Sequence, residues 1–269
     1  MDPCQSEGIV IQASSGLFQV ETAHGVIECM ARAGADPGGI VPGDRVLISP
    51  QPAGRGVIES MMPRATRFSR KVAGRRQDEQ VIAANLDQVV VVLAVAEPPF
   101  KETTLDRYLA AAEHCDLNAV VCINKVDLVP APDPDSACDL ADRAEVYSRI
   151  GYMVIMTSAE TGSGIALLRQ TLEGRVSALV GPSGVGKSSL ICAVSPGVNL
   201  DTSEISSSTG KGRHTTTCSR LIKLDGGGYV ADTPGMREFG FHQISRDELA
   251  WCFREFRPHT KSCRFADCH

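Results

Sequence analysis

The chain has 269 residues, of which 43% are hydrophobic and 22% charged, proportions that are ordinary for a globular protein. No apolar run reaches the roughly 18–20 residues that a membrane helix needs, so the sequence excludes a membrane-spanning protein. The formal net charge of −5 excludes a uniformly basic surface that would attract nucleic acid from every side.

Residues 8–60 contain five short β-like runs, which are separated by clusters of Gly, Pro, Asp and Ser. Several short strands at close spacing predict a small antiparallel β-barrel, which we assign to residues 1–62. This segment has three Lys/Arg, seven Asp/Glu and one aromatic residue, Phe18. It therefore offers few platforms on which RNA bases can stack.

Residues 63–76 hold six basic side chains and no acidic one. Charge alone favours a nucleic-acid contact no more than it favours a solvated linker. Because the barrel is a poor RNA binder by composition, we place any RNA contact in this segment, in the Gly- and Thr-rich loop at residues 210–217 and in the basic C-terminal tail within residues 241–269. The candidate RNA-binding residues of the segment are Arg64, Arg67, Arg70, Lys71, Arg75 and Arg76.

Apolar strands alternate with helical segments from residue 81 onward. The run at 87–95, DQVVVVLAV, is apolar on every side, which is typical of a strand buried on both faces of a parallel sheet. Residues 103–116 carry apolar side chains on one helical face. The alternation predicts an α/β domain with a mostly parallel sheet over residues 63–240, and its ligand should bind beyond the carboxyl ends of the strands.

Two loops that follow predicted strands suit a guanine base. In NKVD, residues 124–127, the Asp127 carboxylate can accept two hydrogen bonds from guanine, whereas adenine offers neither donor there. In TSAE, residues 157–160, the Ala159 N–H can meet guanine O6. Each segment alone also fits an ordinary polar loop. The predicted guanine-binding residues are Asn124, Lys125, Asp127, Ser158 and Ala159.

Residues 181–189, GPSGVGKSS, fit the phosphate-binding pattern G-x-x-x-x-G-K-[ST] between a predicted strand and a predicted helix. Backbone N–H groups of such a loop wrap phosphates, and the helix N-terminus adds positive potential. Lys187 would reach the β- and γ-phosphates, and Ser188 would ligate Mg²⁺. The predicted phosphate-binding residues are Gly181, Pro182, Ser183, Gly184, Val185, Gly186, Lys187, Ser188 and Ser189.

Two further segments suit the γ-phosphate and its Mg²⁺. In GKGRHTTT, residues 210–217, Thr215 or Thr216 is the candidate that completes the Mg²⁺ shell in a switch, and an ordinary surface loop is the alternative. In DTPG, residues 232–235, Asp232 can hold Mg²⁺ through water and the Gly235 N–H can sense the γ-phosphate.

The residue after DTPG is Met236, at a position where many GTPases place a water-orienting Gln. An apolar side chain cannot orient water, so we predict slow hydrolysis by the isolated protein. His214 is the best internal candidate for this role, and a loop or RNA contact is the alternative. The predicted catalytic residues are therefore Lys187, His214 and Gly235.

The motif order is that of a GTPase domain cut and rejoined elsewhere, because the guanine loops precede the phosphate loop. The reversal costs little, since all these elements are loops on one edge of a sheet and domain termini often lie close together. The chain resembles the circularly permuted GTPases and, more closely, the ribosome-small-subunit-dependent GTPase A family (RsgA/YjeQ). The stretches that carry this resemblance include VPGDRV, PRATRFSR, LDRYL, NKVDL, GPSGVGKSSL, GKGRHTTT, ADTPGMREF and CRFADCH.

The resemblance implies an N-terminal OB-fold barrel, a permuted P-loop GTPase domain and a C-terminal zinc-binding domain. It also implies binding to the small ribosomal subunit and its rRNA during late maturation, with GTP hydrolysis stimulated by the subunit. Residues 241–269 depart from the family pattern, because the chain ends at His269 before the motif is complete. We expect a truncated zinc region whose site is incomplete. Its candidate ligands are Cys263, Cys268 and His269.

The sequence thus predicts a ribosome-assembly GTPase that binds GTP or GDP with Mg²⁺ and acts as a soluble monomer without membrane contact. An RNA-binding nucleotide sensor with negligible intrinsic hydrolysis is the first alternative, and Met236 supports it. A P-loop ATPase or kinase is the second, and NKVD argues against it. A bacterial cytoplasm, a chloroplast stroma or a mitochondrial matrix would suit the predicted function.

Overall fold

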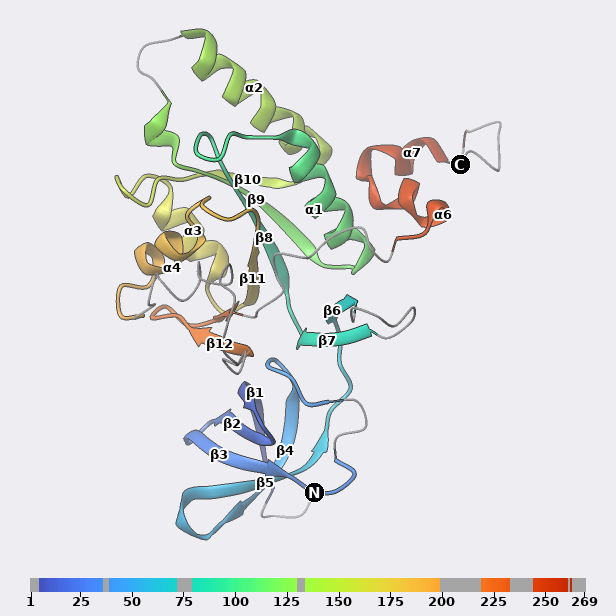
Figure 1. Ribbon diagram of the computed structural model, residues 1–269, viewed down its shortest axis with the longest axis vertical. Helices are drawn as coiled ribbons and strands as arrows, with labels where there is room; N and C mark the ends of the chain where they lie inside the picture. The colour runs from blue at the N-terminus through green and yellow to red at the C-terminus, as the bar shows by residue number, and fades with distance from the viewer. Residues whose placement is uncertain are drawn as a thin grey trace, which may run out of the picture.

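The computed structural model describes residues 5–35, 39–71, 79–129, 134–198, 219–232, 244–260 and 262. A sheet of eleven strands runs through this part of the chain, in the order β10-β9-β8-β11-β13-β12-β1-β2-β3-β5-β4. A second sheet contains only β6 and β7. Figure 1 shows the barrel strands at one end of the molecule and the helices at the other.

The N-terminal strands form the predicted barrel. They pair in the order β1-β2-β3-β5-β4, and an additional pairing of β1 with β4 closes the ring. All pairs are antiparallel except β3 with β5. Alternate side chains fill its core, among them Val10, Val20 and Ile48. The strands are β1 (Ser6–Ser14), β2 (Leu17–Thr22), β3 (Gly25–Ala31), β4 (Arg45–Gln51) and β5 (Arg55–Met61), with the 3₁₀ turn η1 (Pro52–Gly54) between the last two.

The α/β part has the predicted, mostly parallel sheet. The five strands β10, β9, β8, β11 and β13 are parallel neighbours, and β12 is antiparallel to β13. All seven residues of β8 are buried, as expected of a strand covered on both faces. The strands are β8 (Gln88–Ala94), β9 (Asn118–Asn124), β10 (Met153–Met156), β11 (Val176–Val180), β12 (Ser219–Lys223) and β13 (Tyr229–Asp232).

Helices cover both faces of this sheet (Figure 1). On one face, α1 and α2 pack Leu105 and Tyr147 against Val89 and Val91. On the other face, α3 and α4 pack against the intervening side chains of the same strands. This alternation makes the carboxyl ends of the strands the free edge at which a ligand can bind. The helices are α1 (Glu102–His114), α2 (Pro134–Ile150), α3 (Ile165–Leu172) and α4 (Lys187–Val194), with the 3₁₀ turn η2 (Val126–Leu128) after β9.

The barrel and the α/β part share one sheet, a feature the sequence did not predict. Strand β1 pairs with β12 through Gln12 opposite Arg220 and Ala13 opposite Ser219. Glu21 of the barrel reinforces the join by pairing with Lys223 and by accepting a 2.8 Å hydrogen bond from the Tyr229 hydroxyl. The two parts therefore meet at the strand that follows the predicted switch.

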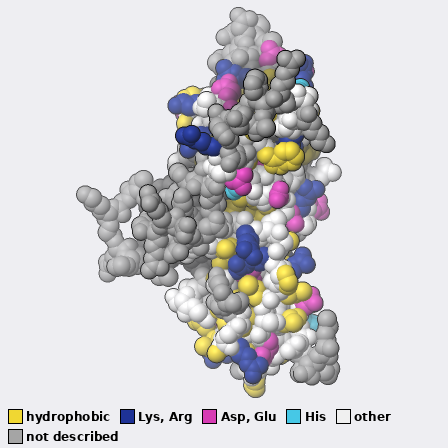
Figure 2. All heavy atoms as spheres, turned by 90° about the vertical axis from the view of Figure 1, so that its right-hand side faces the viewer, with side chains coloured by type: hydrophobic (Ala, Val, Ile, Leu, Met, Phe, Trp, Pro, Cys, Tyr) yellow, Lys and Arg dark blue, Asp and Glu magenta, His cyan; other side chains and the backbone are white. Residues whose placement is uncertain are grey.

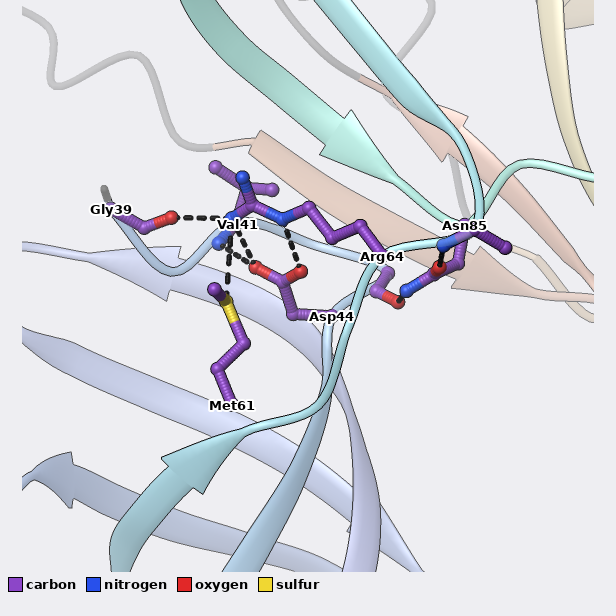
Figure 3. A network of polar contacts seen from close by, with 8 residues as sticks. Gly39, Val41, Asp44, Met61, Arg64 and Asn85 are labelled. Atoms are coloured by element: carbon purple, nitrogen blue, oxygen red, sulfur yellow. Dashed lines mark hydrogen bonds and ion pairs between the residues drawn. The ribbon is translucent and has the colours of Figure 1, made fainter. Parts of the chain in front are cut away.

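A buried ion pair fixes the chain where it leaves the barrel for β6 (Arg67–Lys71) and β7 (Glu79–Ala84), as Figure 3 shows. The Asp44 carboxylate is fully buried and accepts hydrogen bonds from Arg64 at 2.7 and 2.8 Å. Arg64 also donates to the Gly39 carbonyl at 2.6 Å. Asn85 bridges to Gly43 O and Ala65 N, both at 2.8 Å. This network holds the barrel, the linker and the start of the α/β sheet together.

The C-terminal segment lies against α1 (Figure 1). Glu113 of α1 accepts 2.6 Å hydrogen bonds from both Arg254 and Arg257. Arg254 also lies over the ring of Tyr152. No helix in the described ranges is long and apolar enough to cross a membrane. The elements of this segment are α6 (Arg246–Leu249), η4 (Ala250–Cys252), η5 (Arg254–Phe256) and α7 (Arg257–Thr260).

Candidate functional site

The predicted phosphate loop joins β11 to α4, as the sequence pattern requires. Gly181 has φ +140° and Gly186 has φ +92°, both in the left-handed region that favours glycine. A Cβ at Gly181 would lie 2.1 Å from Val92 O, and one at Gly186 would lie 2.4 Å from Asn124 Nδ2. The loop therefore packs its backbone directly against β8 and against the NKVD loop.

Lys187 is folded back over this loop. Its Nζ donates to the carbonyl oxygens of Gly181 and Pro182 at 2.8 and 2.7 Å. These contacts hold the ammonium group at the start of α4, where a helix N-terminus attracts anions. Ser188 follows in the first turn and is partly exposed.

Asn124 ties the guanine loop to the phosphate loop. It is buried at the end of β9, and its Nδ2 donates to Val185 O at 2.8 Å. Its Oδ1 accepts a 3.1 Å hydrogen bond from the hydroxyl of Thr157, which is also buried. Asn124 thus links the end of β9 to both the phosphate loop and the TSAE loop. Sequence reasoning missed Thr157, although it is the first residue of TSAE.

The other NKVD residues face a different environment. Lys125 has a left-handed backbone with φ +63°, and its Nζ donates to Glu97 O. Asp127 lies in η2 and is exposed. Within the described ranges, no hydrogen bond reaches its carboxylate, so both oxygens can receive the two donors of a guanine edge.

The TSAE loop is joined to NKVD by main-chain hydrogen bonds. Thr157 N donates to Ile123 O at 2.8 Å, and Val126 N donates to Thr157 O at 3.2 Å. Ser158 is fully buried, and its hydroxyl accepts from Thr161 N at 3.1 Å. Ser158 thus shapes the turn that presents Ala159, which is partly exposed.

A third loop contacts both the NKVD loop and the phosphate loop, and no sequence motif pointed to it. Residues 95–100 follow β8, and Glu97 O receives the Lys125 ammonium. A Cβ on Gly184 would lie 3.6 Å from Pro98 Cδ, so the same loop also touches the phosphate loop. Loop 95–100 therefore links the NKVD loop to the phosphate loop.

Asp232 ends β13, directly beside the strand that enters the phosphate loop. The parallel register places Ala231 opposite Ala178, so Asp232 emerges at the same edge as Gly181. Its Oδ2 lies 3.2 Å from Nε of Arg220, its cross-strand partner. A carboxylate and the Ser188 hydroxyl are oxygen ligands of the kind that Mg²⁺ takes.

Several predicted residues lie outside the described ranges, and their placement stays a prediction. They are His214, Thr215, Thr216, Gly235, Cys263, Cys268, His269, Arg75 and Arg76. In the described ranges, no group of three or more His, Cys, Asp or Glu is arranged to hold a metal. Cys252 is buried, its thiol donates to Glu248 O at 3.3 Å, and burial raises its pKa.

The basic linker residues divide into two groups. Arg64 is engaged by Asp44 and Gly39, which gives it a structural role rather than a surface one. Arg67 is exposed at the start of β6, and Arg70 and Lys71 belong to the same strand. On the side that bears α6 and α7, Figure 2 shows basic and acidic side chains interspersed, without one continuous basic patch among the coloured atoms.

Comparison with known proteins agrees with this geometry. The family model described as RsgA GTPase matches residues 61–242. A protein of Gemmatimonas aurantiaca named small ribosomal subunit biogenesis GTPase RsgA is 43% identical over 97% of this chain and 86% of its own. A protein of the same name from Moorella thermoacetica is 41% identical over 97% of this chain and 85% of its own.

Two solved structures share the fold. The crystal structure of YjeQ from Thermotoga maritima has a TM-score of 0.80 at 36% identity, covering 98% of this chain and 86% of that one. The structure of YloQ, described as a circularly permuted GTPase, has a TM-score of 0.76 at 28% identity, covering 98% and 83%. With the permuted motifs meeting at one sheet edge, these matches show that the chain belongs to the RsgA family of circularly permuted GTPases.

Proposed function

We propose that this protein hydrolyses GTP to GDP and phosphate in the biogenesis of the small ribosomal subunit, and that the subunit stimulates hydrolysis. The observation that carries the proposal is the 2.8 Å hydrogen bond from Asn124 to Val185 O, which joins the guanine loop and the phosphate loop into one site. The name shared by the relatives from Gemmatimonas aurantiaca and Moorella thermoacetica, small ribosomal subunit biogenesis GTPase RsgA, supports the role in biogenesis.

Guanine recognition falls to the NKVD and TSAE loops. The Asp127 carboxylate accepts from the ring N1–H and the exocyclic amine, while the Ala159 N–H donates to O6. Adenine lacks the two donors, so a site of this kind discriminates against ATP. Lys125 is held by Glu97 O beside the base position.

Phosphate binding falls to the loop N–H groups and Lys187. In the structure, Lys187 bonds to two carbonyls of its own loop. We expect its ammonium group to turn from these carbonyls to the β- and γ-phosphate oxygens, because the charge of a phosphate exceeds that of a carbonyl dipole. The Gly235 N–H would sense the γ-phosphate.

The Ser188 hydroxyl and the Asp232 carboxylate would hold Mg²⁺, with Thr215 or Thr216 of the switch. The bound ion neutralises charge on the β- and γ-phosphate oxygens. The described residues fit this group, because both are oxygen ligands and both lie at the same edge of the sheet. Cys263, Cys268 and His269 offer thiolate and imidazole ligands of the kind that zinc takes.

Water activation is the weakest part of the isolated site. Met236 has no hydrogen-bond donor, and only a weakly accepting thioether, in the position of a water-orienting Gln. We propose that His214 orients the attacking water when the ribosomal partner is bound, and that hydrolysis without the partner is slow. The basic strand from Arg67 to Lys71, with Arg75 and Arg76, is the proposed rRNA contact.

The test is the rate of phosphate release as purified small ribosomal subunits are added, with large subunits as the matched control. We expect a saturable rise in the rate of phosphate release with small subunits and none with large subunits. If small subunits bind in a GTP-dependent manner without raising phosphate release, the protein is a nucleotide sensor. If they neither bind nor stimulate, the assignment to small-subunit biogenesis is wrong.

A further inference from the structure

Arg220 and Asp232 form an ion pair across β12 and β13. They are direct cross-strand partners in the antiparallel register, and Arg220 Nε lies 3.2 Å from Asp232 Oδ2. The two side chains remain 42% and 31% exposed, so water and ions reach both. The pair therefore occupies an accessible edge of the sheet, not its core.

The sheet itself delivers Arg220 to this position. Its main chain is paired with Asp232 on one side and with Gln12 of the barrel on the other. A residue held between two strands keeps its side-chain direction, because successive residues of a strand point to opposite faces. Arg220 is thus oriented toward the carboxylate before any ligand arrives.

Asp232 is also the carboxylate that the proposed function assigns to Mg²⁺. A carboxylate binds a cation through charge attraction. The Arg220 guanidinium, at hydrogen-bond distance, is already such a cation for Asp232. A divalent ion beside Asp232 meets repulsion from that guanidinium at close range. Arg220 and Mg²⁺ therefore compete for the same carboxylate, and binding of either one weakens binding of the other.

We propose that Arg220 is a positioning residue that holds the Asp232 carboxylate in the absence of Mg²⁺ and competes with the ion for it. The inference rests on the proposed assignment of Asp232 to Mg²⁺. Exposed ion pairs are weak, so the competition is modest, and removing Arg220 tightens Mg²⁺ binding about threefold to fivefold. A purely structural Arg220 would leave the Mg²⁺ dependence unchanged.

The chain offers a matched control on the same strand. Lys223 also carries one positive charge on β12, and it pairs with Glu21 of the barrel instead of Asp232. Lys223→Gln and Arg220→Gln therefore change the net charge equally. Only the second removes the cation beside the proposed Mg²⁺ ligand.

The experiment measures how fast a fluorescent GDP analogue leaves the full chain as the Mg²⁺ concentration is varied. Arg220→Gln should lower the Mg²⁺ concentration for half-maximal retention of the GDP analogue about threefold to fivefold. The midpoint of Arg220→Lys should lie between those of Arg220→Gln and wild type. The midpoint of Lys223→Gln should equal that of wild type. Thermal melting without Mg²⁺ checks that each variant is folded. If Arg220→Gln does not fold, Arg220→Lys serves as the test variant.

Two results would overturn the inference, and each rejects a different part of it. An unchanged or higher Mg²⁺ midpoint in Arg220→Gln, with normal Mg²⁺ dependence in wild type, rejects the role of Arg220 alone. Wild-type release that ignores Mg²⁺ rejects the assignment of Asp232 to the ion, and the inference with it.

Discussion

Asn124 and Val185 are 61 residues apart in the sequence, yet the side-chain amide of the first donates to the carbonyl of the second at 2.8 Å. The bond crosses from the end of β9 to the phosphate loop after β11, with β8 between these strands in the sheet. It shows that the reversed order of the motifs leaves their spatial arrangement intact. The carboxyl ends of parallel strands meet at one edge whatever the order in which the chain visits them.

Replacing Asn124 with Ala should lower both stability and nucleotide affinity. Val185 O would lose its side-chain donor in a buried setting, which costs about 1–3 kcal/mol of unfolding free energy. Loss of the tie between the loops should weaken GDP binding about tenfold or more. Urea unfolding and GDP titration measure the two effects. Asn118→Ala, at the exposed start of the same strand, is the control, and equal effects of the two substitutions would contradict the role of Asn124.

Asp127→Asn should change the preferred base from guanine to xanthine and should not abolish nucleotide binding. The Asn side chain presents an NH₂ donor to the exocyclic group of the base, where the Asp carboxylate presents an acceptor oxygen. Two charge-assisted hydrogen bonds are lost for guanine, so GTP affinity should fall about 100-fold or more. Xanthine has a carbonyl at that position, so XTP should gain affinity in the same variant. A variant that keeps wild-type GTP affinity would remove Asp127 from the base site.

Gly186→Ala should disable the phosphate loop through a clash as well as through strain. Its backbone has φ +92°, and the added Cβ would lie 2.4 Å from Asn124 Nδ2. Gly174→Ala separates the two causes, because Gly174 has φ +68° and open space around its Cβ position. Both substitutions should cost about 1–3 kcal/mol of stability through strain. Only Gly186→Ala should also lose nucleotide binding in a GDP titration.

Arg64→Met should destabilise the protein by about 3–5 kcal/mol, because it leaves the fully buried Asp44 carboxylate without its guanidinium. Chemical denaturation measures the loss. Arg32→Met removes an exposed pairing with Glu59 and should change stability little. If Arg64→Met were as stable as Arg32→Met but bound small subunits less tightly, Arg64 would belong to the RNA contact after all.

Stability at alkaline pH should depend on Tyr229. Burial and the Glu21 carboxylate raise the pKa of Tyr229 from 10.0 to about 12. Since the folded state holds the proton more tightly, this contribution is fully present below pH 10 and is lost as the pH rises toward 12. Tyr229→Phe should therefore show a smaller fall in unfolding free energy over that range. Parallel curves for the two proteins would show that folding does not raise the pKa of Tyr229.

Much of the fold and the site was readable from local pattern. The five β-like runs became β1 to β5, and the continuous apolar run at 87–95 became the buried strand β8, because side-chain period and composition determine strand burial. The guanine and phosphate loops were predicted because each sits at the end of an apolar strand. The carboxyl ends of parallel strands lie at one edge of the sheet, so the order of the motifs along the chain does not change which loops meet there.

The remaining features depend on contacts that no local pattern encodes. The pairing of β1 with β12 joins strands about 200 residues apart, and only the tertiary fold brings them together. The role of Thr157 depends on the buried amide of Asn124, and the role of loop 95–100 depends on the backbone carbonyl of Glu97. Arg64 looked like a surface charge until the structure placed Asp44 beside it.

The most direct test of a single guanine-nucleotide site built from reversed motifs is a calorimetric titration of the full chain with GDP and Mg²⁺, followed by competition with ATP. We expect one GDP per chain, displaced by GTP and not by ATP at about 100-fold excess. Binding of more than one GDP, or displacement by ATP as readily as by GTP, would contradict it.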